Sequence, residues 1–269
     1  MPVMNRLTTV LASLRNRRKK ALALFLTAGY PEADSTPGLV HSLSGAGADI
    51  IEIGMPFSDP LADGPVIQQS SAIALQNGVT IAGILDAIRT IRKTSSVPLV
   101  LMGYINPILS YGSDRFFRDA ASSGVDGLIL PELTLEESVR FKAEISGCGL
   151  SQILLVAPTT PEDRVIAIDA ASSGFLYCVS TTGVTGSPGK GTPDEFLTRV
   201  KSCAKRNPVL VGFGISTAEG ARHAALLSDG VIIGSALIRR LSEGESIGSI
   251  TSWVSSIRDA LSIDAPSGI

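Results

Sequence analysis

The sequence predicts a closed (β/α)8 barrel of the TIM-barrel class, with an N-terminal capping helix and an extra helix after the second strand. Eight short apolar runs rich in β-branched residues recur along the chain, and most are continuously hydrophobic, as in parallel strands covered on both faces. Segments with helical periodicity separate them, such as Ile81–Ile91 and Leu135–Ile145. This alternation fits one domain spanning residues 1–269.

The expected strands follow one another at fairly regular intervals. In order they are Ala21–Thr27, Asp49–Gly54, Pro98–Gly103, Gly127–Pro131, Gln152–Pro158, Phe175–Val179, Pro208–Gly214 and Gly230–Ser235. The interval between the second and third runs leaves room for the extra helix, near Val66–Gln76. The alternative architecture is a doubly wound open sheet, because the same alternation of elements also builds that fold.

The segment before the first strand predicts a helix that closes one end of the barrel. Leu7, Val10, Leu11 and Leu14 follow helical spacing, and a basic run, residues 17–20, follows them. A basic, acid-poor leader is also typical of organelle-targeting segments. The helical spacing favours the capping helix, and with it a cytoplasmic protein.

Composition narrows the possible partners. The chain is 44% hydrophobic with a net charge of −2, which argues against disorder and against nucleic-acid or membrane-surface binding. No apolar run approaches the roughly 18 residues needed to span a bilayer. The three cysteines, Cys148, Cys178 and Cys203, form no CxxC pair, which favours a reducing compartment over a disulfide framework.

Glycines follow the last two expected strands, at Gly212–Ser216 and at Gly234–Ser235. Bare backbone amides ahead of a helix N-terminus bind anions, and phosphate sites recur at these two junctions of the barrel fold. Tight turns are the plainer interpretation, but two glycine-rich loops at the two expected junctions favour a phosphate site. The long loop 181–193 after the sixth strand is expected to be a lid over that site, although an ordinary surface loop has the same composition.

Glu52 interrupts the apolar second strand near its C-terminal end. Strand alternation places it opposite Ile51 and Ile53, and a carboxylate facing the lumen would have a raised pKa that suits acid–base catalysis. A structural ion pair is the alternative, but no Lys or Arg lies on a neighbouring expected strand. Asp63 follows in a Pro- and Gly-flanked loop that could bring it over the barrel mouth; alone it would be an ordinary turn residue.

The run from Ile51 to Gln68, IEIGMPFSDPLADGPVIQ, resembles the signature of the tryptophan synthase α-chain family. Similar motifs continue in family order at residues 25–31, 101–107, 183–186, 212–216 and 229–236, so the resemblance covers essentially the whole chain. It implies a lyase that cleaves indole-3-glycerol phosphate, a phosphate ester, to indole and glyceraldehyde 3-phosphate. It also implies a cofactor-free chain, paired in an α2β2 heterotetramer with a β subunit that carries pyridoxal phosphate.

The resemblance also implies roles for individual residues. Glu52 would be the general acid and base, Asp63 would accept the indole N–H, and Tyr177 would support Glu52, although a buried core aromatic is the commoner fate of a strand tyrosine. The remaining expected contacts are a phosphate site of Gly186, Gly214, Gly234 and Ser235, an indole site of Phe25, Leu101 and Phe213, and Thr185 in the lid.

One departure from the family pattern follows the fourth strand. The family has Pro-Asp-Leu-Pro in the loop that faces the β subunit, whereas this chain has Pro131, Glu132, Leu133 and Thr134. The departure puts the strength of coupling between the subunits in doubt, but not the chemistry.

Missing residues exclude related chemistries. No lysine lies at the C-terminal end of an expected strand, which argues against a Schiff-base aldolase and against the related indole-glycerol-phosphate synthase barrel. The two histidines, His41 and His223, lie in helical stretches, so no metal site is expected. Two alternatives to a partnered lyase remain open: a catalytically silent partner that regulates the β subunit, and a free-standing lyase that releases indole.

Overall fold

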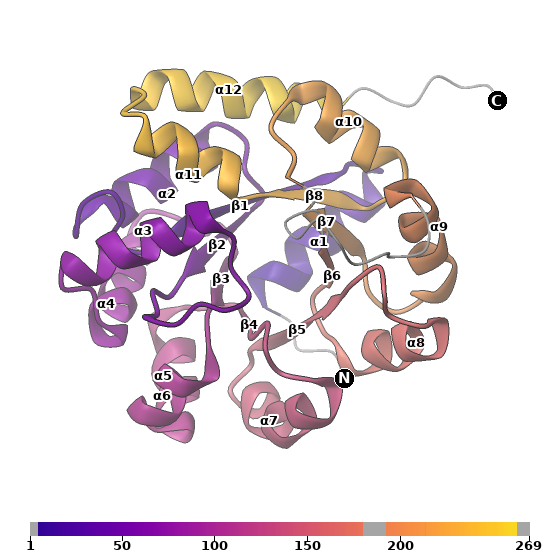
Figure 1. Cartoon of the computed structure of the whole chain (residues 1–269), viewed down its shortest axis with the longest axis horizontal. Coiled ribbons are helices and arrows are strands. Elements are labelled where there is room, and N and C mark those ends of the chain that lie inside the picture. Colours follow the sequence, from indigo (N-terminus) through magenta and orange to yellow (C-terminus); the bar gives the residue numbers. More distant parts are fainter. Residues whose placement is uncertain (1–4, 180–191, 213, 263–269) are drawn as a thin grey trace.

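A computed structural model describes residues 5–179, 192–212 and 214–262. Eight parallel strands form a closed barrel in chain order, and β8 pairs with β1 (Figure 1). The strands are β1 (Ala21–Thr27), β2 (Ile50–Gly54), β3 (Leu99–Met102), β4 (Gly127–Ile129), β5 (Ser151–Val156), β6 (Leu176–Val179), β7 (Val209–Gly212) and β8 (Gly230–Ile233). The closed barrel confirms the predicted fold and excludes the open doubly wound sheet.

Helices surround the barrel on all sides (Figure 1). They are α1 (Arg6–Asn16), α2 (Ser35–Gly45), α3 (Pro65–Gln76), α4 (Ile81–Arg92), α5 (Ile105–Tyr111), α6 (Ser113–Ser123), α7 (Leu135–Gly147), α8 (Glu162–Ala171), α9 (Pro193–Cys203), α10 (Ala218–Leu226), α11 (Ser235–Ser242) and α12 (Ile247–Ala260). The extra helix predicted after the second strand is α3. Two helices also follow β3 and two follow β8, and the second helix in each place was not predicted.

Alternation along the strands separates the core into two layers. Residues such as Ala23, Ile50 and Val100 fill the lumen, whereas neighbours such as Leu24 and Ile51 pack outward against the helices. Apolar side chains on both faces explain why the strands are continuously hydrophobic.

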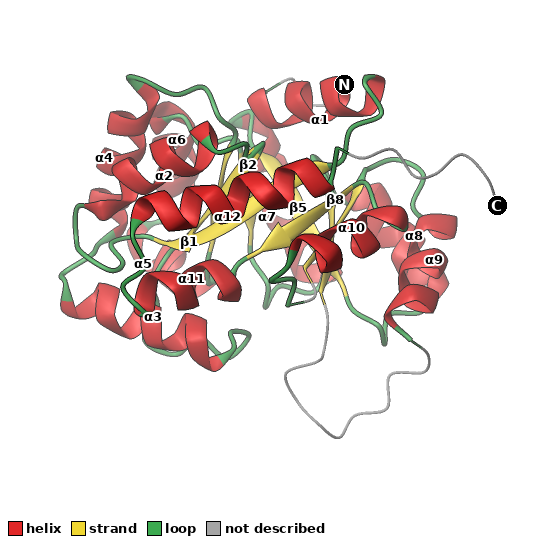
Figure 2. Ribbon diagram, turned by 90° about the horizontal axis from the view of Figure 1, so that it is seen from above, coloured by secondary structure: helices red, strands yellow, loops and turns green. Residues whose placement is uncertain are grey.

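The predicted capping helix is confirmed as α1, whose buried Leu7, Leu11 and Leu14 pack against the lumen cluster. Asn5 begins it with a capping box, in which the Asn5 side chain accepts a hydrogen bond from the Thr8 amide at 3.1 Å. Helix α1 lies at one end of the barrel and α3 lies toward the other (Figure 2). One end is therefore plugged, and access to the lumen is from the C-terminal ends of the strands.

Two negative findings apply to the described part of the chain. No single helix there has both the length and the apolar character to cross a membrane; only the pair α3 and α4, bent by 97°, meets that test by length and composition. Within the same residues, no group of three His, Cys, Asp or Glu side chains is arranged to hold a metal ion.

Candidate active site

Glu52 lies on the lumen face of β2, in register with Phe25 on β1 and Val100 on β3. The residue is completely buried, and neither carboxylate oxygen has a hydrogen-bond partner among the described residues. Burial without compensation disfavours the charged form and raises the pKa of Glu52 to about 8. The predicted inward orientation is thus confirmed, and this carboxyl group is mostly protonated at neutral pH.

Asp63 lies in the loop between β2 and α3, and this loop is held in place by short-range contacts. The Asp63 amide donates to the Pro60 carbonyl at 3.0 Å, and the Gln68 side chain donates to the Asp63 carbonyl at 2.8 Å. Burial raises the pKa of the Asp63 carboxyl to about 6, although a hydrogen bond with Tyr104 lowers it and the charge of Glu132 raises it further. Asp63 is therefore mostly ionised at neutral pH.

Tyr177 lies on β6 among the lumen residues, next to Gly212 of β7. A Cβ atom added at Gly212 would lie 3.0 Å from the Tyr177 hydroxyl oxygen, so the glycine leaves room for the phenol. Burial raises the pKa of Tyr177 well above its usual value, and the charges of Glu52 and Asp63 raise it further. The influence of both carboxylates shows that the three predicted catalytic side chains share one site.

Phe25 is buried in the lumen face at the C-terminal end of β1. A Cβ atom at Gly54 would lie 2.5 Å from Cζ of Phe25, and one at Gly234 would lie 3.3 Å from its Cβ. Only glycine at position 54 allows the ring to lie across the end of β2. The structure thus provides an aromatic surface close to Glu52, where the sequence placed one side of the indole site.

Leu101 does not lie in the lumen, so its expected place beside the indole was wrong. It pairs with Ile53 and Leu128 and is fully buried in the outer layer of the core. Strand alternation instead turns the next residue, Met102, inward, and Met102 lines a narrow cavity at the barrel mouth together with Phe25 and Asp63. The resemblance located the strand correctly, but the facing residue is one position later.

The expected phosphate site is described in part. Gly234 caps α11, no side chain caps this helix end, and Ser235 is exposed as its first residue, so free backbone amides point outward there. Gly214 has a φ of +62°, a left-handed conformation that favours glycine, and open space surrounds it. The remaining predicted contacts, Thr185, Gly186 and Phe213, lie outside the described residues.

Two residues that influence Asp63 were not identified from the sequence. The Tyr104 hydroxyl accepts a hydrogen bond from the Ala62 amide at 2.9 Å. The Tyr104 ring packs in a tilted arrangement against the Phe57 ring, with centroids 5.3 Å apart. Both contacts hold the loop that carries Asp63. Glu132, noted only as a departure, accepts a hydrogen bond from the Ile105 amide at the start of α5. Contacts of Asp63 with residues in the segments after β3 and β4 cannot be found from periodicity, because the loop conformations decide them.

Comparisons with known proteins agree with this geometry. The family described as tryptophan synthase alpha chain matches residues 11–256. The chain belongs to the tryptophan synthase alpha chain family. It is 47% identical over 238 residues to the tryptophan synthase alpha chain of Citrifermentans bemidjiense, covering 88% of this chain and 89% of that protein. The Geobacter sulfurreducens alpha chain is 43% identical over 263 residues, covering 96% and 99%.

Solved structures give the same result. The tryptophan synthase alpha chain from Legionella pneumophila subsp. pneumophila matches with a TM-score of 0.88 and 37% identity, over 98% of this chain and 100% of that one. A chain in tryptophan synthase from M. tuberculosis, in an aminoacrylate- and BRD0059-bound form, matches with a TM-score of 0.86 and 34% identity, over 96% and 99%.

Membership of the family establishes the activity. The chain is a lyase of tryptophan biosynthesis that cleaves indole-3-glycerol phosphate to indole. The alpha chain needs no cofactor of its own, and the pyridoxal phosphate of tryptophan synthase resides in the β subunit. The predicted family and enzyme class are both confirmed, which excludes the catalytically silent partner.

Proposed function

We propose that Glu52 transfers the proton in this cleavage, first as an acid and then as a base. The reaction moves one proton from the side-chain hydroxyl of the substrate to the indole ring carbon that carries the side chain. With a pKa of about 8, Glu52 begins protonated at neutral pH and can protonate the ring carbon. The resulting carboxylate then removes the hydroxyl proton as the carbon–carbon bond breaks. Glu52 ends protonated, ready for the next turnover.

Asp63 supplies the complementary charge in this proposal. Protonation of the ring carbon puts positive charge on the ring nitrogen, and an ionised carboxylate that accepts the indole N–H stabilises that charge. The pKa of about 6 for Asp63 keeps it charged at the pH at which Glu52 is still protonated. The single observation that carries the proposal is this pair of carboxyl groups with pKa values on opposite sides of neutrality.

The other predicted contacts follow from these two. Tyr177, whose hydroxyl stays protonated, would be a neutral donor that orients the Glu52 carboxylate once it has released its proton. Phe25 and Met102 would flank the indole, with Phe213 and the lid residue Thr185 completing the pocket. Gly186, Gly214, Gly234 and Ser235 would bind the phosphate through backbone amides and the Ser235 hydroxyl.

We further propose that the chain is one domain, acts in the cytoplasm and pairs with a β subunit in an α2β2 heterotetramer. The similar chains from M. tuberculosis tryptophan synthase support this partner. The loop that departs from the family pattern ends at α7, where Thr134 and Glu137 form a capping box. A free-standing lyase is the alternative assembly.

The test is release of glyceraldehyde 3-phosphate from indole-3-glycerol phosphate, with and without a cognate β subunit. Weak release alone, strong release in the mixture and a complex by size-exclusion chromatography are expected. Glu52→Gln and Asp63→Asn should each lower release by about 100-fold or more in both conditions. Asp259→Asn, a charge-matched change on the exposed side of α12, should leave it unchanged. Substantial activity in either site variant would overturn the assignment of roles, and no complex would favour the free-standing lyase.

A further inference from the structure

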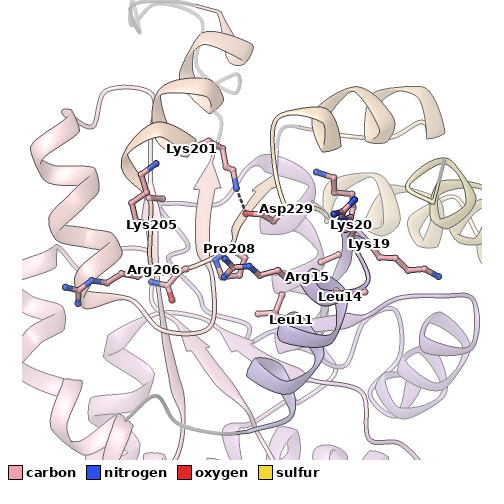
Figure 3. A pocket seen from close by; sticks show the side chains of 14 residues that line it. Leu11, Leu14, Arg15, Lys19, Lys20, Lys201, Lys205, Arg206, Pro208 and Asp229 are labelled. Carbon is pink, nitrogen blue, oxygen red and sulfur yellow. Dashed lines mark hydrogen bonds and ion pairs between the residues drawn. The ribbon is translucent and has the colours of Figure 1, made fainter. Parts of the chain in front are cut away.

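Figure 3 shows a second cavity, which is lined by residues of α1, of α9 and of the segments that precede β1, β7 and β8. Its volume is about 470 Å³, and its floor includes Ala21, Pro208 and Asp229, which stand at or just before the starts of β1, β7 and β8. These three strands are neighbours in the barrel. The cavity is therefore at the N-terminal face, away from the C-terminal strand ends where the lyase site lies. Cavities of this size hold small molecules.

The walls of this cavity are strongly basic. One wall, from the end of α1 to the start of β1, carries four cationic side chains: Arg15, Arg18, Lys19 and Lys20. The other wall, at the end of α9 and in the segment after it, carries Lys201, Lys205 and Arg206. Of the 23 Lys and Arg residues in a chain with net charge −2, seven line this one cavity, whereas Asp229 is the one acidic residue that lines it. Positive potential is concentrated here in an otherwise acidic protein.

Asp229, the acidic residue that lines the cavity, already has hydrogen-bond partners. Oδ2 of Asp229 accepts hydrogen bonds from Lys201 Nζ at 2.7 Å and from the Val209 amide at 2.7 Å. Among the described residues, no ion pair joins the other basic side chains of the cavity to a carboxylate. Lys20 is half-buried, and among the described residues its ammonium group donates to the Ser228 carbonyl at 2.6 Å. Burial lowers its pKa, the charge of Asp229 raises it, and the charge of Lys201 lowers it.

The backbone at Arg18 adds an independent observation. Its φ is +53°, the left-handed conformation, and the Lys19 amide closes the helix end by donating to the Leu14 carbonyl at 2.9 Å. Glycine is the usual residue at this position after a helix, because a side chain there is strained. An arginine at a position that favours glycine, on the wall of a basic cavity, is the arrangement expected where the charge itself is used.

We propose that this cavity binds a small anion that carries two or more phosphate groups. An anion with several phosphate groups can contact both walls at once, whereas one monophosphate would compensate only a minor part of their charge. Arg15 extends from α1 across the floor toward Pro208, and Lys201 extends toward Asp229, whereas Lys19 and Arg206 extend outward at the rim (Figure 3). Guanidinium groups and ammonium groups are the usual protein partners of phosphate oxygens. The site is separate from the substrate phosphate site, so it does not depend on the roles proposed for Glu52 and Asp63.

The test uses calorimetric titration of the full chain with inorganic tripolyphosphate at low salt. One anion should bind per chain, with an affinity that falls as ionic strength rises. Arg15→Gln combined with Lys20→Gln removes two charges from the cavity while retaining N–H donors, and should weaken binding by about tenfold or more. Arg140→Gln combined with Lys142→Gln, the same charge change on exposed positions of α7, should leave it within about twofold. Unchanged binding in the cavity variant would overturn the proposal, because the anion would then occupy another site.

Two single variants keep the result independent of folding. Arg18→Gly relieves the left-handed strain, so it should raise the thermal midpoint and yet weaken tripolyphosphate binding. Asp229→Asn retains an acceptor for the Val209 amide but removes the negative charge, so it should tighten binding. Inorganic phosphate should bind about tenfold more weakly than tripolyphosphate. Equal affinity for the two anions, unaltered binding in Arg18→Gly, or no binding to the native chain would each overturn the proposal.

Discussion

Glu52 and Asp126 are both completely buried carboxylates, yet they lie at opposite ends of the barrel and have opposite surroundings. Neither oxygen of Glu52 has a partner among the described residues. The Asp126 oxygens accept hydrogen bonds from Arg92 at 2.8 Å, the Leu99 amide at 2.9 Å, and the Arg6 side chain and amide at 3.2 and 3.3 Å. Burial alone therefore does not distinguish the two carboxylates: the missing partners at Glu52 are what suit it to the proposed proton transfer.

The difference matches the two faces of the barrel. Asp126 joins α1, α4 and β3 at the plugged end, where a fixed charge stabilises the assembly of elements. Glu52 faces the open end, where an uncompensated carboxyl group can change its protonation state at little structural cost. The buried carboxylate that stabilises the fold, Asp126, thus lies at the N-terminal end of the barrel strands, and the one proposed to react, Glu52, faces the C-terminal end.

The largest expected effect is that of Glu52→Gln. Loss of the proton-transferring group should reduce cleavage by on the order of 10³-fold, while the neutral, nearly isosteric amide keeps the fold. Turnover of indole-3-glycerol phosphate and the circular dichroism spectrum would be measured on the same preparation. A variant that is inactive only because it is unfolded would leave the comparison with Asp126 unsupported.

The same variant should alter the pH dependence of stability. The pKa of Glu52 is raised from 4.5 to about 8 in the folded state. Between pH 4.5 and pH 8, the folded chain therefore keeps a proton that the unfolded chain has released. The contribution of Glu52 to the free energy of unfolding is therefore fully present below pH 4.5 and is lost as the pH rises from 4.5 to about 8, by on the order of 5 kcal/mol in total. Urea unfolding of Glu52→Gln at pH 6 and pH 9 should lack this decrease; a parallel decrease in both proteins would contradict the raised pKa.

Asp126→Asn should have the opposite profile. The amide leaves the guanidinium of Arg92 without its buried anionic partner, and breaking such a pair costs about 3 kcal/mol or more of unfolding free energy. The rate per folded molecule should not change, because Asp126 lies away from the lumen mouth. Denaturant unfolding gives the first quantity, and turnover corrected for the folded fraction gives the second. Asp86→Asn, whose pair with Arg89 is exposed, is the control and should cost little.

The sequence was sufficient for the parts of this molecule that periodicity determines. The continuous apolar strands, the capping leucines of α1 and the inward position of Glu52 all follow from residue spacing and are confirmed. Spacing was insufficient where a one-residue shift reverses a side chain, as at Leu101 and Met102, since a motif match does not report which face a residue occupies. Contacts between loops are harder still to predict from the sequence, because Tyr104 and Asp63 are far apart along the chain and meet only in the folded structure.

Tyr104→Phe should have a smaller effect than either buried carboxylate variant. The hydrogen bond with the Tyr104 hydroxyl lowers the pKa of Asp63, so its loss should raise that pKa above its present value of about 6. Because the proposed mechanism needs ionised Asp63, activity on the acidic side should decline at a higher pH than in the native chain. The profile of kcat/KM against pH gives the shift, and an unchanged acidic limb would show that the hydroxyl serves only the Ala62 amide.

Glu132→Gln should shift the same limb in the other direction, and by the least. The charge of Glu132 raises the pKa of Asp63, while its carboxylate oxygen accepts a hydrogen bond from the Ile105 amide. Glutamine keeps the acceptor and removes the charge, so the acidic limb should move to lower pH with kcat near pH 8 unchanged. Glu144→Gln, an exposed change on α7, controls for the net charge. Opposite shifts in Tyr104→Phe and Glu132→Gln would assign that limb to Asp63, whereas shifts of the same sign would mean that a third group controls it.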